Sequence, residues 1–360
     1  MAGRYDPLTR TAIRGGRTTV PPAPGTGTGT APGTGTATGP SPGTRTRTRT
    51  RTRTWTPPTP LDLGLTLGPL RRGPADPTFR ATAGAVWRAT RTPAGPATLR
   101  VTRDGAGAGP GVTATAWGPG ADWILDGLPE LLGSADDPSG FVPRHRLVHA
   151  SHRRRPGLRL TRTGLVLESL IPTVLEQKVT ADEAYRAWRR LVRQYGEPAP
   201  GPDPGPHENG APDLYVMPDP RTWALIPSWD WHKAGVDSKR SATIVRAARL
   251  AARLEEAAAM DLPAATARLE AVPGIGPWTS AETLQRSNGA PDAVTTGDLH
   301  LPGIIGYALA GDRDADDAVM LELLAPYAGQ RHRAARLVLL AGGAPPRRAP
   351  RMPRGDIGKL

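Results

Sequence analysis

Apolar residues recur at the spacing of an α-helix through most of the chain after residue 159. In the first such segment the apolar side chains stand at Leu167, Leu170, Ile171, Val174 and Leu175. Recurrence every three to four residues predicts an amphipathic helix whose apolar stripe faces a core. Pro172 fits this helix only in its first turn or at a kink, because proline lacks the backbone N–H.

A second helix is predicted to begin at the sequence TADE, because Thr180 and Glu183 have the spacing of a capping box. Its apolar positions are Ala184, Trp188, Leu191, Val192 and Tyr195. Gln177 and Lys178 therefore stand at an exposed corner between two helices. Further helical patterns cover about 244–254, 263–271, 278–287, 299–310, 316–326 and 331–341, and the proline-rich residues 197–213 indicate a surface loop.

Upstream of these helices the pattern changes to alternation. Residues 85–90, 97–103 and 112–117 are rich in β-branched residues and are separated by glycine- and proline-rich turns. The alternation of apolar Leu99 and Val101 with polar neighbours is typical of a half-buried strand, and a helical spacing follows at 120–133. We expect a small α+β domain over residues 77–155 and a helical domain over residues 156–345, followed by a C-terminal tail at 346–360.

The first 76 residues have a low-complexity composition, with GTGTGT giving way to RTRTRTRTRT and WTPPTP. Such a segment has almost nothing to bury, so it is predicted to be a disordered tail. The arginine-threonine run is either a flexible arm that binds phosphates or the translation of repeated DNA without a function of its own.

Composition limits the classes of site that the chain can carry. The net charge is +13, but eleven arginines against Asp6 and Asp62 place much of it in the first 75 residues, so the basic character is weak evidence for nucleic acid. Cysteine is absent, which excludes disulfides, thiolate metal sites, iron-sulfur clusters and a cysteine nucleophile. With no apolar run of about 18 residues and no secretory signal, the chain is expected to be soluble and intracellular.

The sequence LEAVPGIGPWTSA at 269–281 predicts a tight helix-hairpin-helix, because one helix ends near Leu269 and another begins at Trp278. Gly274 and Gly276 allow positive φ and close approach of the backbone, while Ile275 between them is expected to point into the core. The N–H groups at the start of the second helix favour a phosphate. A plain corner between helices also uses glycine, so this motif alone leaves both interpretations open.

Asp298 stands at the start of an apolar helix, in the sequence TTGDLHL. Taken alone, it is either the N-cap of that helix, a common structural role, or a functional carboxylate.

The order of hairpin, helix, short loop and aspartate resembles the helix-hairpin-helix superfamily of base-excision DNA glycosylases. The similarity covers roughly residues 77–345 and is closest to the 3-methyladenine DNA glycosylase II family. It rests on VPGIGPWTSA, on the aspartate of TTGDLHL and on LEQKVT in the earlier helix. The fold that this resemblance implies is mainly α, with helix-hairpin-helix glycosylase domains, a small N-terminal α+β domain and a disordered N-terminal tail.

The resemblance implies a monofunctional glycosylase. Lyase members of the superfamily carry a lysine where this chain has Trp278, and without that amine no Schiff base forms. Asp298 is then the catalytic carboxylate, which stabilises an oxocarbenium-like sugar and orients water. Trp278 lines the pocket for the flipped base, where its ring attracts a cationic purine, unless it is simply a core tryptophan. Glu282 stands where the related enzyme has a second pocket tyrosine.

The DNA-binding residues implied by the resemblance lie at the hairpin and at the corner; they are Gly274, Ile275, Gly276, Thr279, Gln177 and Lys178. The corner enters the duplex as a wedge, although the glycosylase II branch has a leucine where this chain has Lys178. Lys178 is otherwise an exposed residue at a helix end. Trp229 and Trp231 are interpreted as core or interface aromatics, and Lys239 and Arg240 either contact phosphate or are solvated.

The resulting hypothesis is hydrolysis of the N-glycosidic bond of 3-methyladenine or 7-methylguanine in double-stranded DNA by base flipping, which starts base excision repair. The alternative is a non-catalytic helix-hairpin-helix protein that binds DNA or senses damage. The expected partner is double-stranded DNA with alkylated bases, bound by a monomer in the bacterial cytoplasm at the nucleoid. No cofactor and no metal site is expected, because the seven histidines lack metal-ligand spacing.

Overall fold

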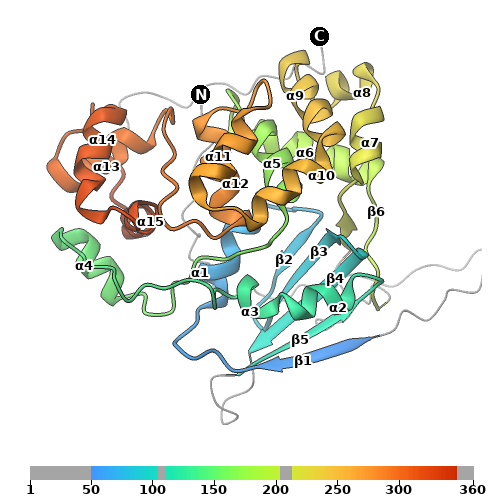
Figure 1. Cartoon of the computed structure of the whole chain (residues 1–360), viewed down its shortest axis with the longest axis horizontal. Coiled ribbons are helices and arrows are strands. Elements are labelled where there is room, and N and C mark those ends of the chain that lie inside the picture. The colour runs from blue at the N-terminus through green and yellow to red at the C-terminus, as the bar shows by residue number, and fades with distance from the viewer. Residues whose placement is uncertain (1–49, 104–110, 203–212, 347–360) are drawn as a thin grey trace, which may run out of the picture. The chain divides into compact units, whose positions relative to one another are not determined.

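Five antiparallel strands form a sheet in the N-terminal part of the computed structural model, which describes residues 50–103, 111–202 and 213–346 (Figure 1). The strands are β1 (Arg51–Trp55), β2 (Phe79–Ala81), β3 (Ala85–Thr92), β4 (Gly95–Arg103) and β5 (Val112–Trp117), in the spatial order β1-β5-β4-β3-β2. In β4, Leu99 and Val101 are buried and Arg100 and Thr102 half-buried, which confirms the predicted alternation.

Strand β1 corrects the predicted boundary of the N-terminal tail. Arg51 to Trp55 pair in register with β5, so the expectation of disorder up to residue 76 is wrong from residue 51 onward. The low-complexity run RTRTW has a period of two, and it places Arg51, Arg53 and Trp55 on the half-buried side. Arg53 donates to the carbonyl of Leu125 at 2.7 Å. Its side chain therefore occupies an inward-facing position of the strand, with the charged end hydrogen-bonded. Residues 1–49 and 347–360 lie outside the described residues.

One face of the sheet packs against short helices. These are α1 (Leu63–Leu67), α2 (Ala121–Asp126) and α3 (Leu128–Leu131). Leu99 and Val101 share a core with Leu67, Leu125 and Leu128. Helix α1 lies inside the segment that was predicted to be disordered, and Asp62 caps it by accepting the N–H of Leu65 at 2.9 Å. The opposite face carries stacked tryptophans and meets the short strand pair β6 (Glu197–Pro198) and β7 (Tyr215–Val216).

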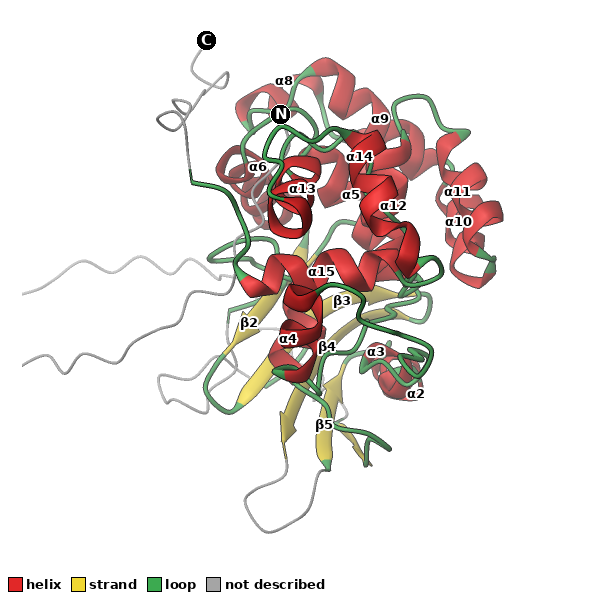
Figure 2. Ribbon diagram, turned by 90° about the vertical axis from the view of Figure 1, so that its left-hand side faces the viewer, coloured by secondary structure: helices red, strands yellow, loops and turns green. Residues whose placement is uncertain are grey.

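Helix α4 (Arg146–Arg153) packs with the C-terminal helices rather than with the sheet. Val148 shares a buried cluster with Leu301, Ile305 and Leu337. Those residues belong to α13 (Leu301–Ala310) and α15 (Arg331–Ala341), which are accompanied by α14 (Asp317–Leu324). Figure 2 shows α4 beside α15. The domain boundary that we predicted at residue 155 therefore falls after a helix that packs with the helical part.

The remaining helices surround α5 (Val166–Leu175). They are α6 (Ala181–Tyr195), α7 (Pro220–Leu225), α8 (Ser228–Lys233), α9 (Ser238–Arg249), α10 (Ala251–Glu255), α11 (Leu262–Glu270) and α12 (Pro277–Ser287), with 3-10 turns at Gly68–Leu70, Glu256–Ala259 and Ala325–Tyr327. Every residue of α5 except Glu168 is buried. Pro172 lies inside the helix beyond its first turn, which leaves a kink as the other predicted alternative, and the Thr180–Glu183 capping box of α6 is confirmed.

Candidate active site and nucleic-acid interface

Helices α11 and α12 are joined by the predicted tight hairpin. Ile275 is buried in the main helical core, which confirms its predicted direction. Gly274 has φ of +100°, a region that favours glycine, but Gly276 is extended at φ −117° and ψ −176°. Of the two glycines that allow positive φ, Gly274 therefore adopts it and Gly276 does not. Because Gly276 caps α12 in an extended conformation, only Gly274 needs glycine for its backbone dihedrals.

Helix α9 supports the hairpin from behind. A Cβ atom at residue 274 would lie 2.1 Å from Oγ1 of Thr243, so glycine is required for this packing as well. Arg246, one turn further along α9, donates from Nε and Nη2 to the carbonyl oxygen of Pro273 at 3.2 and 3.0 Å. The close approach of Gly274 is thus made to the protein's own helix, and the loop is held before any ligand arrives.

Gln177 connects the corner between α5 and α6 to the hairpin. Its Nε2 donates to the carbonyl oxygen of Gly274 at 3.0 Å and to Oγ1 of Thr279 at 2.8 Å. Thr279 is buried, so its hydroxyl serves this internal contact, and what it offers outward is the N–H at the start of α12. Two segments almost 100 residues apart, both predicted to bind DNA, therefore form one unit.

Lys178 is the exposed tip of that corner. Its φ is +56°, and Ala75 is the other non-glycine residue with positive φ in the described chain. A side chain in the left-handed region is strained, and such strain concentrates at functional positions. The Lys178 side chain is exposed to solvent between α5 and α6, and its predicted entry into a duplex stays a prediction.

Trp278 and Asp298 meet directly. The indole Nε1 of Trp278, in the first turn of α12, donates to Oδ2 of Asp298 at 3.0 Å. Both side chains are half-buried, so Trp278 is not a fully enclosed core tryptophan. The structure thus brings the predicted pocket residue and the predicted catalytic residue into contact.

The other oxygen of Asp298 binds the start of α13, whose N-cap residue is His300. Oδ1 accepts the N–H groups of His300 and Leu301 at 2.7 and 2.8 Å. The two carboxylate oxygens of Asp298 therefore have different partners, because Oδ1 binds the start of α13 and Oδ2 accepts from Trp278. Leu299 and His300 beside it are exposed, which leaves this end of α13 open to solvent.

Glu282, one turn after Trp278 on α12, is buried at 6% exposure. Its Oε2 accepts from Nη1 of Arg286 at 2.8 Å, and its Oε1 accepts from the hydroxyl of Thr295 at 3.0 Å. Where the related family has an aromatic pocket residue, this chain has a carboxylate whose two oxygens are both engaged by protein groups.

The structure gives the surroundings of two tryptophans and two basic residues whose roles the sequence did not decide. Trp231 is buried and stacks on Trp223, whereas Trp229 is 62% exposed. Arg240 is buried and donates to the carbonyls of Leu175 and Gly235, so it holds α9 to α5. Lys239 is exposed beside it, and of these two basic residues it alone is placed to meet a phosphate.

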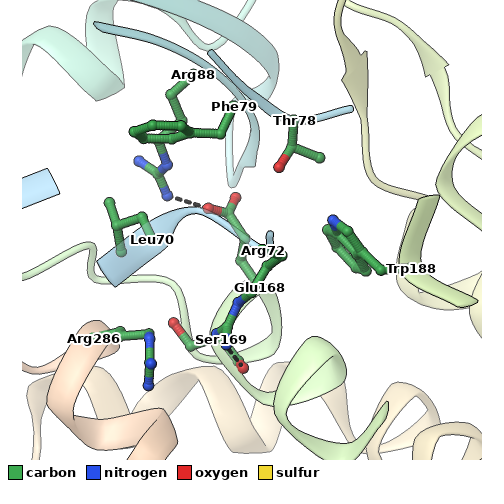
Figure 3. Close-up of a pocket in the computed structure, with 9 residues that line it drawn as sticks. All are labelled: Leu70, Arg72, Thr78, Phe79, Arg88, Glu168, Ser169, Trp188 and Arg286. Atoms are coloured by element: carbon green, nitrogen blue, oxygen red, sulfur yellow. Dashed lines mark hydrogen bonds and ion pairs between the residues drawn. The ribbon is translucent and has the colours of Figure 1, made fainter. Parts of the chain in front are cut away.

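A buried charged cluster behind the corner was not predicted from the sequence. Arg72, which is buried, donates to the half-buried Glu176 at 3.1 Å, next to Gln177. Burial raises the pKa of Glu176 and lowers the pKa of Arg72. Figure 3 shows the adjoining cavity of about 20 Å³, where Arg88 from the sheet points toward Glu168 of α5. These pairs tie the sheet to the helices, and no local sequence signal marks them.

Within the described ranges, no group of three or more His, Asp or Glu side chains is arranged to hold a metal ion. None of the described helices combines the length and apolar character of a membrane span.

No family model matches the chain. A curated relative is the probable bifunctional transcriptional activator/DNA repair enzyme AlkA of Mycobacterium tuberculosis, which is 33% identical over 179 residues. The match covers 49% of this chain and 33% of the relative, so the chain spans about a third of the length of the curated relatives it matches.

Solved structures share the fold over most of their length. The 3-methyladenine DNA glycosylase of Archaeoglobus fulgidus matches with a TM-score of 0.63 and 17% identity, covering 81% of this chain and 98% of that one. The 8-oxoguanine glycosylase/lyase of Clostridium acetobutylicum, solved with double-stranded DNA, matches with a TM-score of 0.60 and 11% identity, covering 78% and 91%. These likenesses establish the predicted fold, which is the fold of the helix-hairpin-helix DNA glycosylases.

Proposed function

We propose that the protein is a monofunctional DNA glycosylase that hydrolyses the N-glycosidic bond of alkylated purines in double-stranded DNA. The observation that carries the proposal is the contact between Trp278 and Asp298. It sets an aromatic face and a carboxylate side by side, both partly open to solvent, at the start of the helix that follows the hairpin.

Asp298 supplies the chemistry in this proposal. Three N–H donors, from Trp278, His300 and Leu301, fix its orientation. Alkylation at N3 or N7 makes a purine cationic, so the base departs with the bonding electrons and leaves an oxocarbenium-like sugar. A carboxylate next to that sugar stabilises the positive charge and orients water, whose oxygen bonds to C1′ while its proton passes to the carboxylate or to solvent.

Trp278 supports the choice of substrate and of reaction. An indole face attracts a cationic base by about 0.5 to 2 kcal/mol, which favours alkylated over normal purines. An indole cannot form a Schiff base with the sugar, so the product is an abasic site in an unbroken strand. The similarity to a glycosylase/lyase is one of fold alone. Trp278 has no amine with which to carry out lyase chemistry.

The corner and the hairpin supply DNA binding. Lys178 enters the gap left by the flipped nucleotide, and Gln177 keeps this tip in register with the hairpin. The first N–H groups of α12 hold a backbone phosphate, a contact that positions DNA without reading its sequence. The partner is thus double-stranded DNA, bound by a monomer.

Base release from methylated duplex tests the proposal. Purified protein is incubated with dimethyl-sulfate-treated DNA, freed bases are identified by mass spectrometry, and abasic sites and strand breaks are counted. We expect 3-methyladenine and 7-methylguanine, no strand breaks and no borohydride-trapped adduct. Asp298→Asn should keep DNA binding and lose turnover, and unchanged turnover in that variant would remove Asp298 from the mechanism.

A non-catalytic DNA-binding protein is the second candidate. The hydrogen bonds of Asp298 to the start of α13 and the carboxylate at Glu282 favour it, because both give purely structural roles to residues near the site. Tight binding to alkylated DNA without release of any base selects this candidate. Release of 8-oxoguanine with strand cleavage would contradict both.

A further inference from the structure

The segment between α12 and α13 carries Asp298, and it has no helix or strand of its own. It is nevertheless held by hydrogen bonds at Ala293, Thr295 and Gly297. Gln285 donates from Nε2 to the carbonyl of Ala293 and to Oγ1 of Thr295, each at 2.9 Å. Asp317 accepts the N–H of Gly297 at 2.8 Å. A loop fixed so often is prearranged rather than shaped by its ligand.

One face of α12 makes most of these contacts. Trp278, Glu282 and Gln285 follow one another at intervals of four and three residues, which places them on the same side of a helix. Trp278 holds Asp298, Glu282 holds Thr295, and Gln285 holds both Thr295 and Ala293. Helix α12, which carries the proposed base-stacking Trp278, thus also fixes the position of the loop that carries Asp298.

Thr295 is the node of this arrangement. Its hydroxyl accepts from Gln285 and donates to Glu282, it is 3% exposed, and it precedes Asp298 by three residues. The hydroxyl donates to one neighbour and accepts from the other. An apolar or aromatic residue at position 282 could not accept the bond that the Glu282 carboxylate accepts. Loss of the hydroxyl would leave both neighbours with unsatisfied buried groups.

Glu282 is committed to the same task. Its two oxygens are taken by Thr295 and Arg286, so neither is free to read a base. A carboxylate at this place therefore supports the loop from below, where an aromatic ring would have formed a second wall of the pocket.

We propose that Thr295 and Glu282 are positioning residues that set the distance between the Asp298 carboxylate and the sugar. The proposal rests on the proposed glycosylase function and adds the support that this chain uses in place of a second pocket aromatic. Catalytic groups must be held within fractions of an ångström of their productive place, and small displacements cost large factors in rate.

Thr295→Val tests this with the least disturbance, since valine has the shape of threonine without the hydroxyl. Changing Glu282 would also remove the buried ion pair with Arg286. A loss of activity in that variant could then come from a destabilised fold rather than from a displaced loop. We expect Thr295→Val to lower the single-turnover rate of 7-methylguanine release at least about tenfold, with affinity for abasic-site DNA unchanged. Thr295→Ser, which keeps the hydroxyl, should recover most of the rate. Thr102→Val, which removes a hydroxyl from β4, is the matched control.

Amide hydrogen exchange over residues 297–301 provides a readout that needs no catalysis. Thr295→Val should speed exchange there, and the control variant should not. If the wild type releases bases and Thr295→Val matches it in rate and exchange, the inference is overturned while the proposed function stands. If the wild type releases no base, the proposed function fails, and exchange alone decides whether Thr295 holds the loop; unchanged exchange overturns the inference there as well.

Discussion

The side-chain amide of Gln177 lies 3.0 Å from the carbonyl oxygen of Gly274, and it joins the helical corner to the hairpin across 97 residues of sequence. The same nitrogen reaches the hydroxyl of Thr279. The corner tip at Lys178 and the start of α12 are therefore fixed relative to each other in the free protein.

Gln177→Ala removes both bonds. At about 0.5 to 1.5 kcal/mol for each hydrogen bond, we expect affinity for abasic-site DNA to fall about 5- to 160-fold, because the corner and the hairpin then reach the duplex out of register. Fluorescence anisotropy at fixed salt measures it. Gln194→Ala on the exposed side of α6 is the control, and equal affinities for the two variants would show that the link is dispensable.

Trp278→Phe separates the two roles of the indole. Phenylalanine keeps an aromatic face for the base but cannot donate to Asp298. A hydrogen bond to a charged group contributes about 1.5 to 3 kcal/mol, so the single-turnover rate should fall about 10- to 100-fold while lesion binding changes little. Trp278→Leu should lose binding too. A phenylalanine variant that keeps the wild-type rate would mean that the bond to Asp298 has no part in catalysis.

Lys178→Gly should stabilise the fold relative to Lys178→Ala, and both should release base slowly. Alanine keeps the Cβ that makes a φ of +56° unfavourable, whereas glycine removes that cost of about 1 kcal/mol. Urea unfolding gives the stability difference, and single-turnover assays give the rates. Equal stabilities would indicate that the corner is not strained, and a wild-type rate in either variant would exclude the wedge role of Lys178.

Acidification should destabilise the protein through His332. Burial, with the positive charges of Arg336, Arg286 and Arg333, holds the pKa of His332 well below its usual value. The folded chain thus keeps His332 neutral where the unfolded chain binds a proton, below about pH 6.5, so the free energy of unfolding falls as the pH drops from 7 toward 5.

The slope assigned to His332 is at most about 1.4 kcal/mol per pH unit. Urea unfolding at several pH values measures it, and His332→Gln should flatten the profile, whereas His232→Gln at an exposed site should not. A profile that His332→Gln leaves as steep as in the wild type contradicts the assignment.

Local sequence patterns predicted those parts of the site whose geometry is set within a few residues. The capping box at Thr180, the positive φ at Gly274 and the inward Ile275 each depend on residues close in the chain. The placement of Asp298 at the start of an apolar helix was predicted as well, because it too depends on neighbouring residues, whereas its catalytic role stays a prediction.

Local patterns did not predict the contacts between segments that are far apart in the sequence. Nothing near Glu282 in the sequence indicates that Thr295 binds its carboxylate, and nothing near Arg72 indicates Glu176. The residues of α4, for which no helix was predicted, were placed in the α+β domain with the preceding strands, although the helix packs against α15. The sequence did not distinguish Gly276 from Gly274, but Gly276 is extended because it is the N-cap residue at the start of α12.

Strand β1 is formed by the end of an Arg-Thr dipeptide repeat, a kind of sequence that can gain or lose units. Moving such a run by two residues along β5 brings an arginine to the place of an arginine and a threonine to that of a threonine, so Trp55 is what marks the end of the pairing. Gaining or losing whole Arg-Thr units ahead of Trp55 should therefore leave the docked edge of the sheet unaltered, whereas a change by a single residue would turn the arginines outward.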